Sequence, residues 1–176
     1  MVPKANIVLI GFMAAGKTTV GEILSGLTGM PLVDTDRVIE KGQGRTTREI
    51  FATDGEPHFR ELERELISVE AARNGVVLAV GGGAVLDGTN VANLSAGGLV
   101  YLLLVTASQV ASRVGADPSR PLLSANVDEI ACLMSSRERA YLDAADVVVE
   151  TDGRSPGEVA GEIAEDFESR RHESRR

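Results

Sequence analysis

The stretch Gly11-Phe12-Met13-Ala14-Ala15-Gly16-Lys17-Thr18-Thr19 fits the pattern G-x-x-x-x-G-K-[ST] at every fixed position. The apolar, β-branched residues 7–10 precede it and are typical of a strand buried on both faces. After it, apolar residues recur at helical spacing before a stop signal at Gly29, namely Val20, Ile23, Leu24 and Leu27. A strand, a glycine-rich turn and a helix in this order are the context that a phosphate-binding loop requires.

The chemistry of such a loop comes mainly from its backbone. Consecutive N–H groups point inward beside the positive end of the helix and hold a polyphosphate. Lys17 adds a positive charge near the β- and γ-phosphates, and the Thr18 hydroxyl is a candidate Mg²⁺ ligand. We expect Gly16 to adopt the most demanding backbone angles. The alternative is a tight turn with an ordinary surface lysine. The candidate nucleotide-binding residues of the loop are Gly11, Ala14, Ala15, Gly16, Lys17, Thr18 and Thr19.

Length and composition favour one soluble globular domain spanning residues 1–176. The chain has 43% hydrophobic and 25% charged residues, close to the average for soluble proteins. It has no apolar run near the roughly 20 residues that a membrane-spanning helix needs, and no signal-peptide pattern, so we expect a cytoplasmic protein. The single cysteine, Cys132, cannot form an internal disulfide, and we expect it to pack as a small apolar residue.

The formal net charge of −8 argues against nucleic acid as the main partner. An acidic protein that binds a nucleotide must concentrate its arginines locally. Arginines in unusual positions therefore carry more weight here than lysines on a solvated face.

Two acids follow the short apolar segment 31–33, in the sequence Asp34-Thr35-Asp36. Ligands gather at the carboxyl ends of parallel strands. One acid there could hold Mg²⁺ through water, and the other could accept a proton from a substrate hydroxyl. The alternative is that either acid only caps the helix expected from residue 37 or 38.

A strongly periodic helix is expected from a capping box at residues 53–56 to about residue 73. Arg60 and Glu63 lie three residues apart on it, so an ion pair could orient the guanidinium, although an arginine on a helix is usually only solvated. The expected apolar stripe of this helix is Phe59, Leu62, Leu66 and Val69.

Gly81-Gly82-Gly83 follows a second buried strand at residues 76–80. Three glycines at a strand end either let a ligand approach bare N–H groups or form a tight turn. After a third strand at 99–105, residues 115–122 have the composition of a lid, with Arg120 flanked by prolines. A closing lid would bring Arg120 to the transferring phosphoryl group; otherwise it is an exposed loop arginine.

The helix expected over residues 126–144 has an apolar seam of Ile130, Met134 and Tyr141, and Arg137 occupies the missing position in it. An arginine in a seam facing the core is costly unless a carboxylate or phosphate meets it, so Arg137 is a site candidate. Arg139 lies off the seam and is expected to be solvated. A last strand at 146–149, a helix at 158–167 and a frayed tail at 168–176 complete the chain.

The ordered set of these features resembles the bacterial shikimate kinases over residues 5 to about 164. The resemblance implies an α/β fold, the three-layer P-loop kinase fold with a five-stranded parallel sheet flanked by helices. It also implies a substrate-binding subregion at about 34–63 and a lid at about 113–125. The matching stretches are residues 11–19, 34–36, 51–56 with Phe59, Arg60 and Glu63, 81–84, 120–123, and Arg137 with Tyr141.

The resemblance also implies roles for individual residues. Asp36 would hold the ring hydroxyls of shikimate and act as the candidate base. Arg60 and Arg137 would bind its carboxylate, aided by backbone N–H groups of Gly81, Gly82 and Gly83. Lys17 and Arg120 would neutralise charge on the transferring phosphoryl group, with Mg²⁺ held by Thr18 and, through water, Asp34. Four residues, Arg113, Arg154, Ser155 and Pro156, would flank the adenine of ATP.

The function implied is phosphorylation of the 3-hydroxyl of shikimate by ATP, by a monomer with no nucleic-acid or membrane partner. Two alternatives remain open: a related kinase acting on another cyclitol or sugar acid, and a non-catalytic nucleotide-binding module. The chain departs from the usual family pattern at Ala14, where glycine is frequent, and at Arg139, where proline is usual.

Overall fold

The computed structural model describes residues 5–115 and 126–173. Its sheet has the strand order β2-β3-β1-β4-β5, and all neighbouring strands pair in parallel. This confirms the predicted α/β fold. All residues of the central strand β1 are buried, as its continuous apolar sequence predicts. The strands are β1 Asn6–Ile10, β2 Leu32–Asp34, β3 Val77–Ala79, β4 Gly98–Leu104 and β5 Val147–Glu150.

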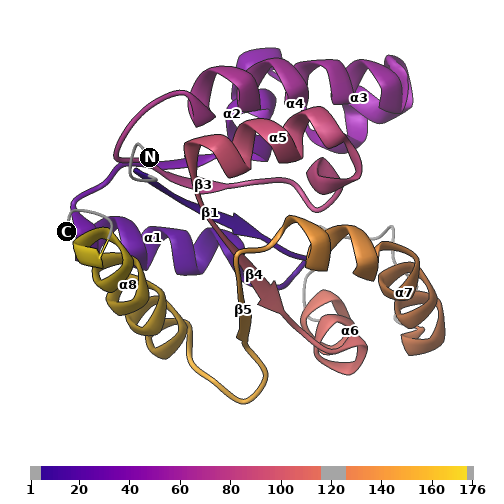
Figure 1. Cartoon of the computed structure of the whole chain (residues 1–176). Helices are drawn as coiled ribbons and strands as arrows, with labels where there is room; N and C mark the ends of the chain where they lie inside the picture. Colours follow the sequence, from indigo (N-terminus) through magenta and orange to yellow (C-terminus); the bar gives the residue numbers. More distant parts are fainter. Residues whose placement is uncertain (1–4, 116–125, 174–176) are drawn as a thin grey trace.

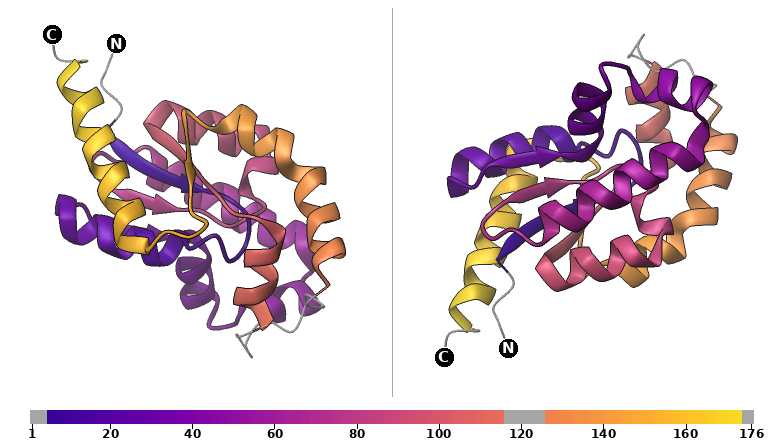
Figure 2. Two further views of the ribbon diagram at one scale, coloured as in Figure 1. Left: turned by 90° about the horizontal axis from the view of Figure 1, so that it is seen from below. Right: turned by 90° about the horizontal axis from the view of Figure 1, so that it is seen from above.

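Helices cover both faces of this sheet (Figure 1). The view from below shows α8 on the near side of the sheet, and the view from above shows α4 on the near side (Figure 2). A short 3-10 helix, η1, covers Ala84–Leu86. The α-helices are α1 Lys17–Thr28, α2 Thr35–Gln43, α3 Thr47–Thr53, α4 Gly55–Ala71, α5 Gly88–Gly97, α6 Ala107–Gly115, α7 Val127–Ala144 and α8 Pro156–Glu173.

The buried apolar residues form two separate clusters. The larger one surrounds the sheet and includes the most deeply buried residues of β1, β3 and β4. The smaller one lies within α2, α3 and α4 and consists of Ile39, Ile50 and Phe59, with Phe51, Leu62 and Leu66 packed against them. The rings of Phe51 and Phe59 meet edge to face at 5.0 Å. The predicted substrate-binding subregion therefore has a small core of its own.

The start and the buried face of α4 differ from the prediction. The capping box lies at Thr46 and Glu49, at the start of α3, and not at residues 53–56. Thr53 is the last residue of α3, and its hydroxyl donates to the Glu49 carbonyl instead of capping α4. Val69 is 63% exposed, so it does not belong to the apolar stripe. The buried face advances four residues at a time, through Phe59, Glu63, Ile67 and Ala71.

Two further expectations are corrected. Helix α8 continues to Glu173, so residues 168–173 are not frayed. Buried Phe167 and the Arg170–Asp166 ion pair extend the helix through its charged end. Cys132 is exposed, and it does not pack in the core. In the part of the chain that the structure describes, no helix is long and apolar enough to cross a membrane.

Candidate active site

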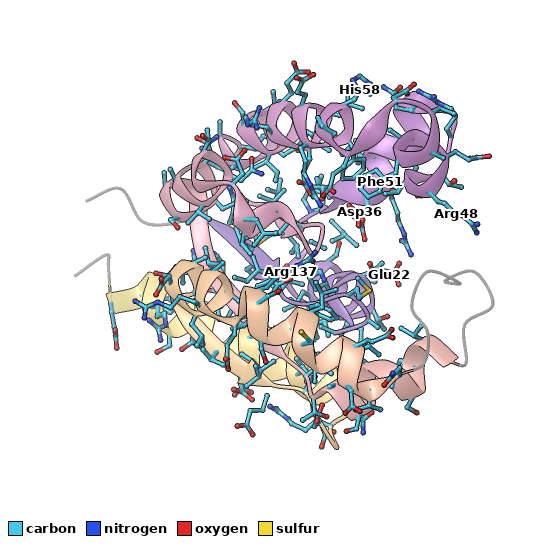
Figure 3. The ribbon with its side chains drawn as sticks, turned by 90° about the vertical axis from the view of Figure 1, so that its right-hand side faces the viewer. Glu22, Asp36, Arg48, Phe51, His58 and Arg137 are labelled. Atoms are coloured by element: carbon cyan, nitrogen blue, oxygen red, sulfur yellow. The ribbon has the colours of Figure 1, made fainter. Side chains whose placement is uncertain are left out.

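The candidate residues gather where the parallel strands end. The P-loop follows β1, Asp34 ends β2, and the glycine triplet follows β3, so all three lie at the carboxyl edge of the sheet. Figure 3 shows Asp36 and Arg137 extending toward the same region from α2 and α7. Residues more than one hundred positions apart in the sequence therefore meet at one site.

The P-loop has three residues with positive φ angles: Gly11 at 143°, Ala14 at 59° and Gly16 at 99°. Gly16 thus adopts a left-handed conformation, as predicted. Ala14 does so as well, and it is the only non-glycine residue with positive φ among those that the structure describes. A Cβ at Gly11 would lie 2.7 Å from the Leu103 carbonyl oxygen, so a larger residue there would collide with β4. The loop conformation therefore depends on both glycines.

Lys17 folds over its own loop. Its Nζ donates to the carbonyl oxygens of Gly11 at 2.7 Å and Phe12 at 3.0 Å. Arg113, from the last turn of α6, donates from Nη1 to the Ala14 carbonyl at 2.8 Å. Two cations thus border the loop that is expected to hold the phosphates, as binding of a polyanion requires.

Thr18 and Asp34 form the candidate metal site. The Thr18 hydroxyl donates to Asp34 Oδ2 at 2.5 Å. Asp34 Oδ1 accepts from the Arg37 N–H, so Asp34 also caps α2, the alternative considered for it from the sequence. A hydroxyl and a carboxylate beside a phosphate loop are oxygen ligands that suit Mg²⁺, which keeps several waters and needs few protein ligands. The residues present therefore fit this ion.

Asp36 lies in the first turn of α2 and is partly buried. Burial raises the pKa of its carboxyl group above the usual range, the positive charge of Lys17 opposes this, and the negative charge of Asp34 adds to it. A carboxylate with a raised pKa is a better proton acceptor than an ordinary aspartate. Its environment is therefore suited to a base.

Acidic residues hold the Arg60 side chain. Nη1 contacts Glu63 at 2.8 Å, while Nε and Nη2 contact the same oxygen of Glu56 at 3.1 and 2.8 Å. Glu63 is fully buried, and its Oε1 has no hydrogen-bond partner among the described residues. Burial raises the pKa of Glu63, and the charge of Arg60 opposes that shift. The predicted ion pair is present, but the burial of its carboxylate was not predicted from the sequence.

The glycine triplet brings the backbone against these side chains. A Cβ at Gly81 would lie 2.6 Å from Asp36 Oδ1 and 2.7 Å from Glu63 Oε1, and a Cβ at Gly83 would lie 2.3 Å from Arg60 Nη2. Close approach is thus one reason for the glycines. The Gly81 N–H is already used, because it donates to the buried hydroxyl of Thr35 at 3.1 Å. Sequence reasoning had not singled out Thr35.

Helix α7 completes the site. Arg137 is partly buried, and Tyr141, one turn later, is buried and donates its hydroxyl to the Gly82 carbonyl oxygen. Arg139 is exposed and binds Asp143 at 2.8 Å, which confirms that it is solvated. Of the two arginines chosen from the sequence, Arg60 lies against Gly83, and Arg137 lies one helical turn before the tyrosine that binds Gly82.

Comparison with known proteins identifies this arrangement. The family model described as Shikimate kinase matches residues 13–168. The chain belongs to the shikimate kinase family. It is 45% identical to the shikimate kinase of Moorella thermoacetica over 91% of this chain and 92% of that one. The shikimate kinase of Streptomyces coelicolor is 43% identical over 87% of this chain and 90% of its own.

Solved structures agree with this assignment. The shikimate kinase of Acinetobacter baumannii, determined in complex with shikimate, aligns with a TM-score of 0.88 at 32% identity, over 94% of this chain and 93% of that one. A gluconokinase from Sinorhizobium meliloti aligns with a TM-score of 0.57 at 14% identity, which shows a shared fold alone. As a shikimate kinase, the chain is a phosphotransferase that uses ATP, and the alternative of a non-catalytic nucleotide-binding module is wrong.

Three candidate residues of this shikimate kinase have structural contacts at the start of α8. Ser155 accepts from the Glu158 N–H and so caps the helix that begins at Pro156. Arg154 donates to the Glu150 carbonyl and pairs with Glu162 at 2.6 Å. Their proposed contact with adenine is additional to these roles. Arg120 and residues 116–125 of the predicted lid lie outside the described residues.

Proposed function

We propose that this shikimate kinase transfers the γ-phosphoryl group of ATP to the 3-hydroxyl of shikimate, giving shikimate 3-phosphate and ADP in chorismate and aromatic amino-acid biosynthesis. The observation that carries the proposal is the placement of Asp36 and Arg60 against a glycine triplet at the end of the strand beside the P-loop, with Arg137 one helical turn from the tyrosine that binds this triplet. A hydroxylated ring with one carboxylate is the kind of substrate that these groups complement. The Acinetobacter baumannii relative was solved with shikimate bound.

Arg60 and Arg137 bind the carboxylate in this proposal. A guanidinium offers paired donors that match a carboxylate better than an ammonium group does. Arg60 already directs its Nε and Nη2 at one carboxylate oxygen, Oε1 of Glu56. Because Glu56 is 60% exposed on its side chain, it can be replaced at this fork by a substrate carboxylate. Glu63 keeps Nη1 in place, and the backbone at Gly81 to Gly83 forms the floor of the site.

Asp36 accepts the proton of the reacting hydroxyl or orients that hydroxyl. Lys17 and Arg120 stabilise the negative charge on the transferring phosphoryl group. The Lys17 ammonium group is already at the P-loop, where its carbonyl contacts are available for exchange with phosphate oxygens. Phosphoryl transfer needs no covalent enzyme intermediate, so positioning and charge carry the catalysis.

The remaining ligands follow from the same geometry. Thr18, and Asp34 through water, would hold Mg²⁺, which when bound neutralises charge on the β- and γ-phosphates. Arg113, beside the loop at Ala14, would flank the adenine together with residues 154–156.

We also propose that the enzyme works as a cytoplasmic monomer on a small molecule, with neither nucleic acid nor a membrane as partner. Its net charge of −8 supports the first of these exclusions.

The proposal predicts selective turnover of a carboxylated acceptor. In a coupled ADP-release assay with Mg-ATP, we expect turnover with shikimate and little with its decarboxylated analogue or with simple cyclitols. Without a carboxylate, the two arginine side chains would lack their substrate partner, which a buried site tolerates poorly. Turnover of a carboxylate-free cyclitol instead would retain the kinase and overturn the substrate assignment. A related sugar acid as the preferred substrate is the second candidate, and the same assay tests it.

The close contact between Gly83 and Arg60 gives a second prediction. In Gly83→Ala the new methyl group meets the end of a flexible side chain, so the fold should survive while the guanidinium moves. We expect the KM for shikimate to rise by about 10- to 100-fold, as loss of a hydrogen bond to a charged group would produce. The control is Gly88→Ala, where a Cβ meets nothing within 4 Å. Steady-state kinetics showing an unchanged KM in Gly83→Ala would contradict the role of Arg60.

A further inference from the structure

Tyr141 connects the helix that carries Arg137 to the glycine triplet. It is 5% exposed, and its hydroxyl donates to the Gly82 carbonyl oxygen. Burial raises the pKa of the Tyr141 hydroxyl, while Arg137, through its charge and a side-chain hydrogen bond, and the positive charge of Arg60 oppose the shift. The hydroxyl therefore stays protonated and able to donate in the neutral pH range.

Gly82 lies against Tyr141, and Gly83 lies against Arg60. A Cβ at Gly82 would come within 3.7 Å of the Tyr141 hydroxyl and 3.4 Å of the Met13 backbone nitrogen. A Cβ at Gly83, the next residue, would collide with the Arg60 guanidinium. The chain of contacts thus runs from α7 through the Tyr141 hydroxyl to the triplet and on to Arg60 in α4. Gly82 also lies close to the P-loop at Met13.

We propose that Tyr141 is a positioning residue for carboxylate recognition: its hydrogen bond to Gly82 fixes the separation of Arg60 and Arg137. The inference rests on the proposed function, in which both arginines bind one substrate carboxylate. Two guanidinium groups can bind the same small carboxylate only if the distance between them is fixed. A displacement of about 1 Å in such a group can cost a factor of about 100 in rate.

Tyr141→Phe tests this inference, and the chain supplies a matched control. Phenylalanine keeps the packed ring and removes only the hydroxyl. The chain has two tyrosines, and the other, Tyr101, is fully buried and donates its hydroxyl to Asp166 on α8, at 2.9 Å. Tyr101→Phe therefore removes another partly buried tyrosine hydrogen bond, one that lies outside the candidate site and ends on a carboxylate.

The decisive measurement is kcat/KM for shikimate and for its decarboxylated analogue, with both variants and the wild type. We expect Tyr141→Phe to lower kcat/KM for shikimate by about 10- to 100-fold. Its kcat/KM for the analogue and its KM for ATP should change less than about twofold, because neither depends on the arginine pair. Tyr101→Phe should leave the ratio of the two acceptors unchanged.

An equal loss with both acceptors in Tyr141→Phe would overturn the inference, because it would show a general structural effect. Unchanged kinetics with shikimate would overturn it too. A wild-type enzyme that uses both acceptors equally well would refute the carboxylate site itself, and with it the proposed function. The failure of the inference is read from the variant, and the failure of the function from the wild type.

Discussion

Replacing Asp36 with asparagine is expected to lower kcat by about 100- to 10,000-fold, the usual contribution of a general base. Asparagine keeps the shape of the side chain but cannot accept the hydroxyl proton. The P-loop is unchanged in this variant, so ATP should still bind. ADP release in the coupled assay measures the loss, and nucleotide binding by calorimetry measures what remains.

The same variant should be more stable than the wild type at neutral pH. The folded state raises the pKa of Asp36 above 3.8, so it binds this proton more tightly than the unfolded state does. Stability contributed by Asp36 is then present at low pH and is lost as the pH rises through the folded pKa. Asparagine carries no charge to bury, so the gain in Tm should be present at pH 7 and should disappear below pH 3.8.

The control is Asp143→Asn, an exposed acid of α7 that pairs with Arg139. It should change neither kcat nor Tm appreciably, because solvent screens an exposed ion pair and leaves it little effect on stability. Near-normal turnover in Asp36→Asn would contradict the role assigned to the carboxylate. A lower Tm at neutral pH would show that burial does not disfavour its ionised form.

Replacing Lys17 with methionine is expected to lower kcat by about 100- to 1,000-fold, as removal of one charge-stabilising donor does in other enzymes. Methionine has a similar length, so the aliphatic packing stays while the ammonium group is lost. In contrast to Asp36→Asn, affinity for ATP should also fall, because in the proposed mechanism the positive charge contacts the phosphates before and during transfer. Both effects are measurable with the same assay and calorimetry.

Lys41→Met is the matched control for Lys17, because it removes an exposed ammonium group in the last turn of α2. It should leave kcat and ATP affinity within about twofold of the wild type. If Lys17→Met kept its kcat and lost only ATP affinity, the lysine would bind ground state and transition state equally. That result would remove Lys17 from the catalytic residues.

The sequence was most informative where one contiguous segment determines the geometry. The residues of the P-loop are neighbours in the chain, so their pattern could predict the strand, the turn and the helix together. Arg60 and Glu63 were paired correctly because helical spacing alone brings them together. The seam on α7 was also predicted correctly at Ile130 and Tyr141, which are both buried, and the role of Arg137 in that seam stays a prediction.

Contacts between distant segments could not be predicted in this way. The bond from Gly81 to Thr35 joins residues 46 positions apart, and the bond from Tyr141 to Gly82 joins residues 59 positions apart. Burial of Glu63 likewise depends on where α4 packs. No local spacing encodes any of these three features.

Two errors came from local signals that fit more than one register. Residues 46–49 and 53–56 both match the T-x-x-E pattern of a capping box, and only the first forms one. Apolar residues on one helix face can be three or four positions apart, so the spacing alone allowed either Val69 or Ile67 on the buried face of α4. In the structure Ile67 packs in the core and is fully buried, whereas Val69 is exposed.

The separate core of α2, α3 and α4 affects how the molecule opens. Because Ile39, Ile50 and Phe59 pack apart from the cluster around the sheet, α2, α3 and the first half of α4 can unfold locally while the P-loop strand stays folded. The second half of α4 stays attached to the sheet through Ile67 and Ala71. Opening of this kind removes Asp36 and Arg60 together and leaves Lys17 in place. The part of the site that binds the phosphoryl acceptor is thus less stable than the part that binds ATP. A bound acceptor would stabilise the folded form of this part, because it binds only that form.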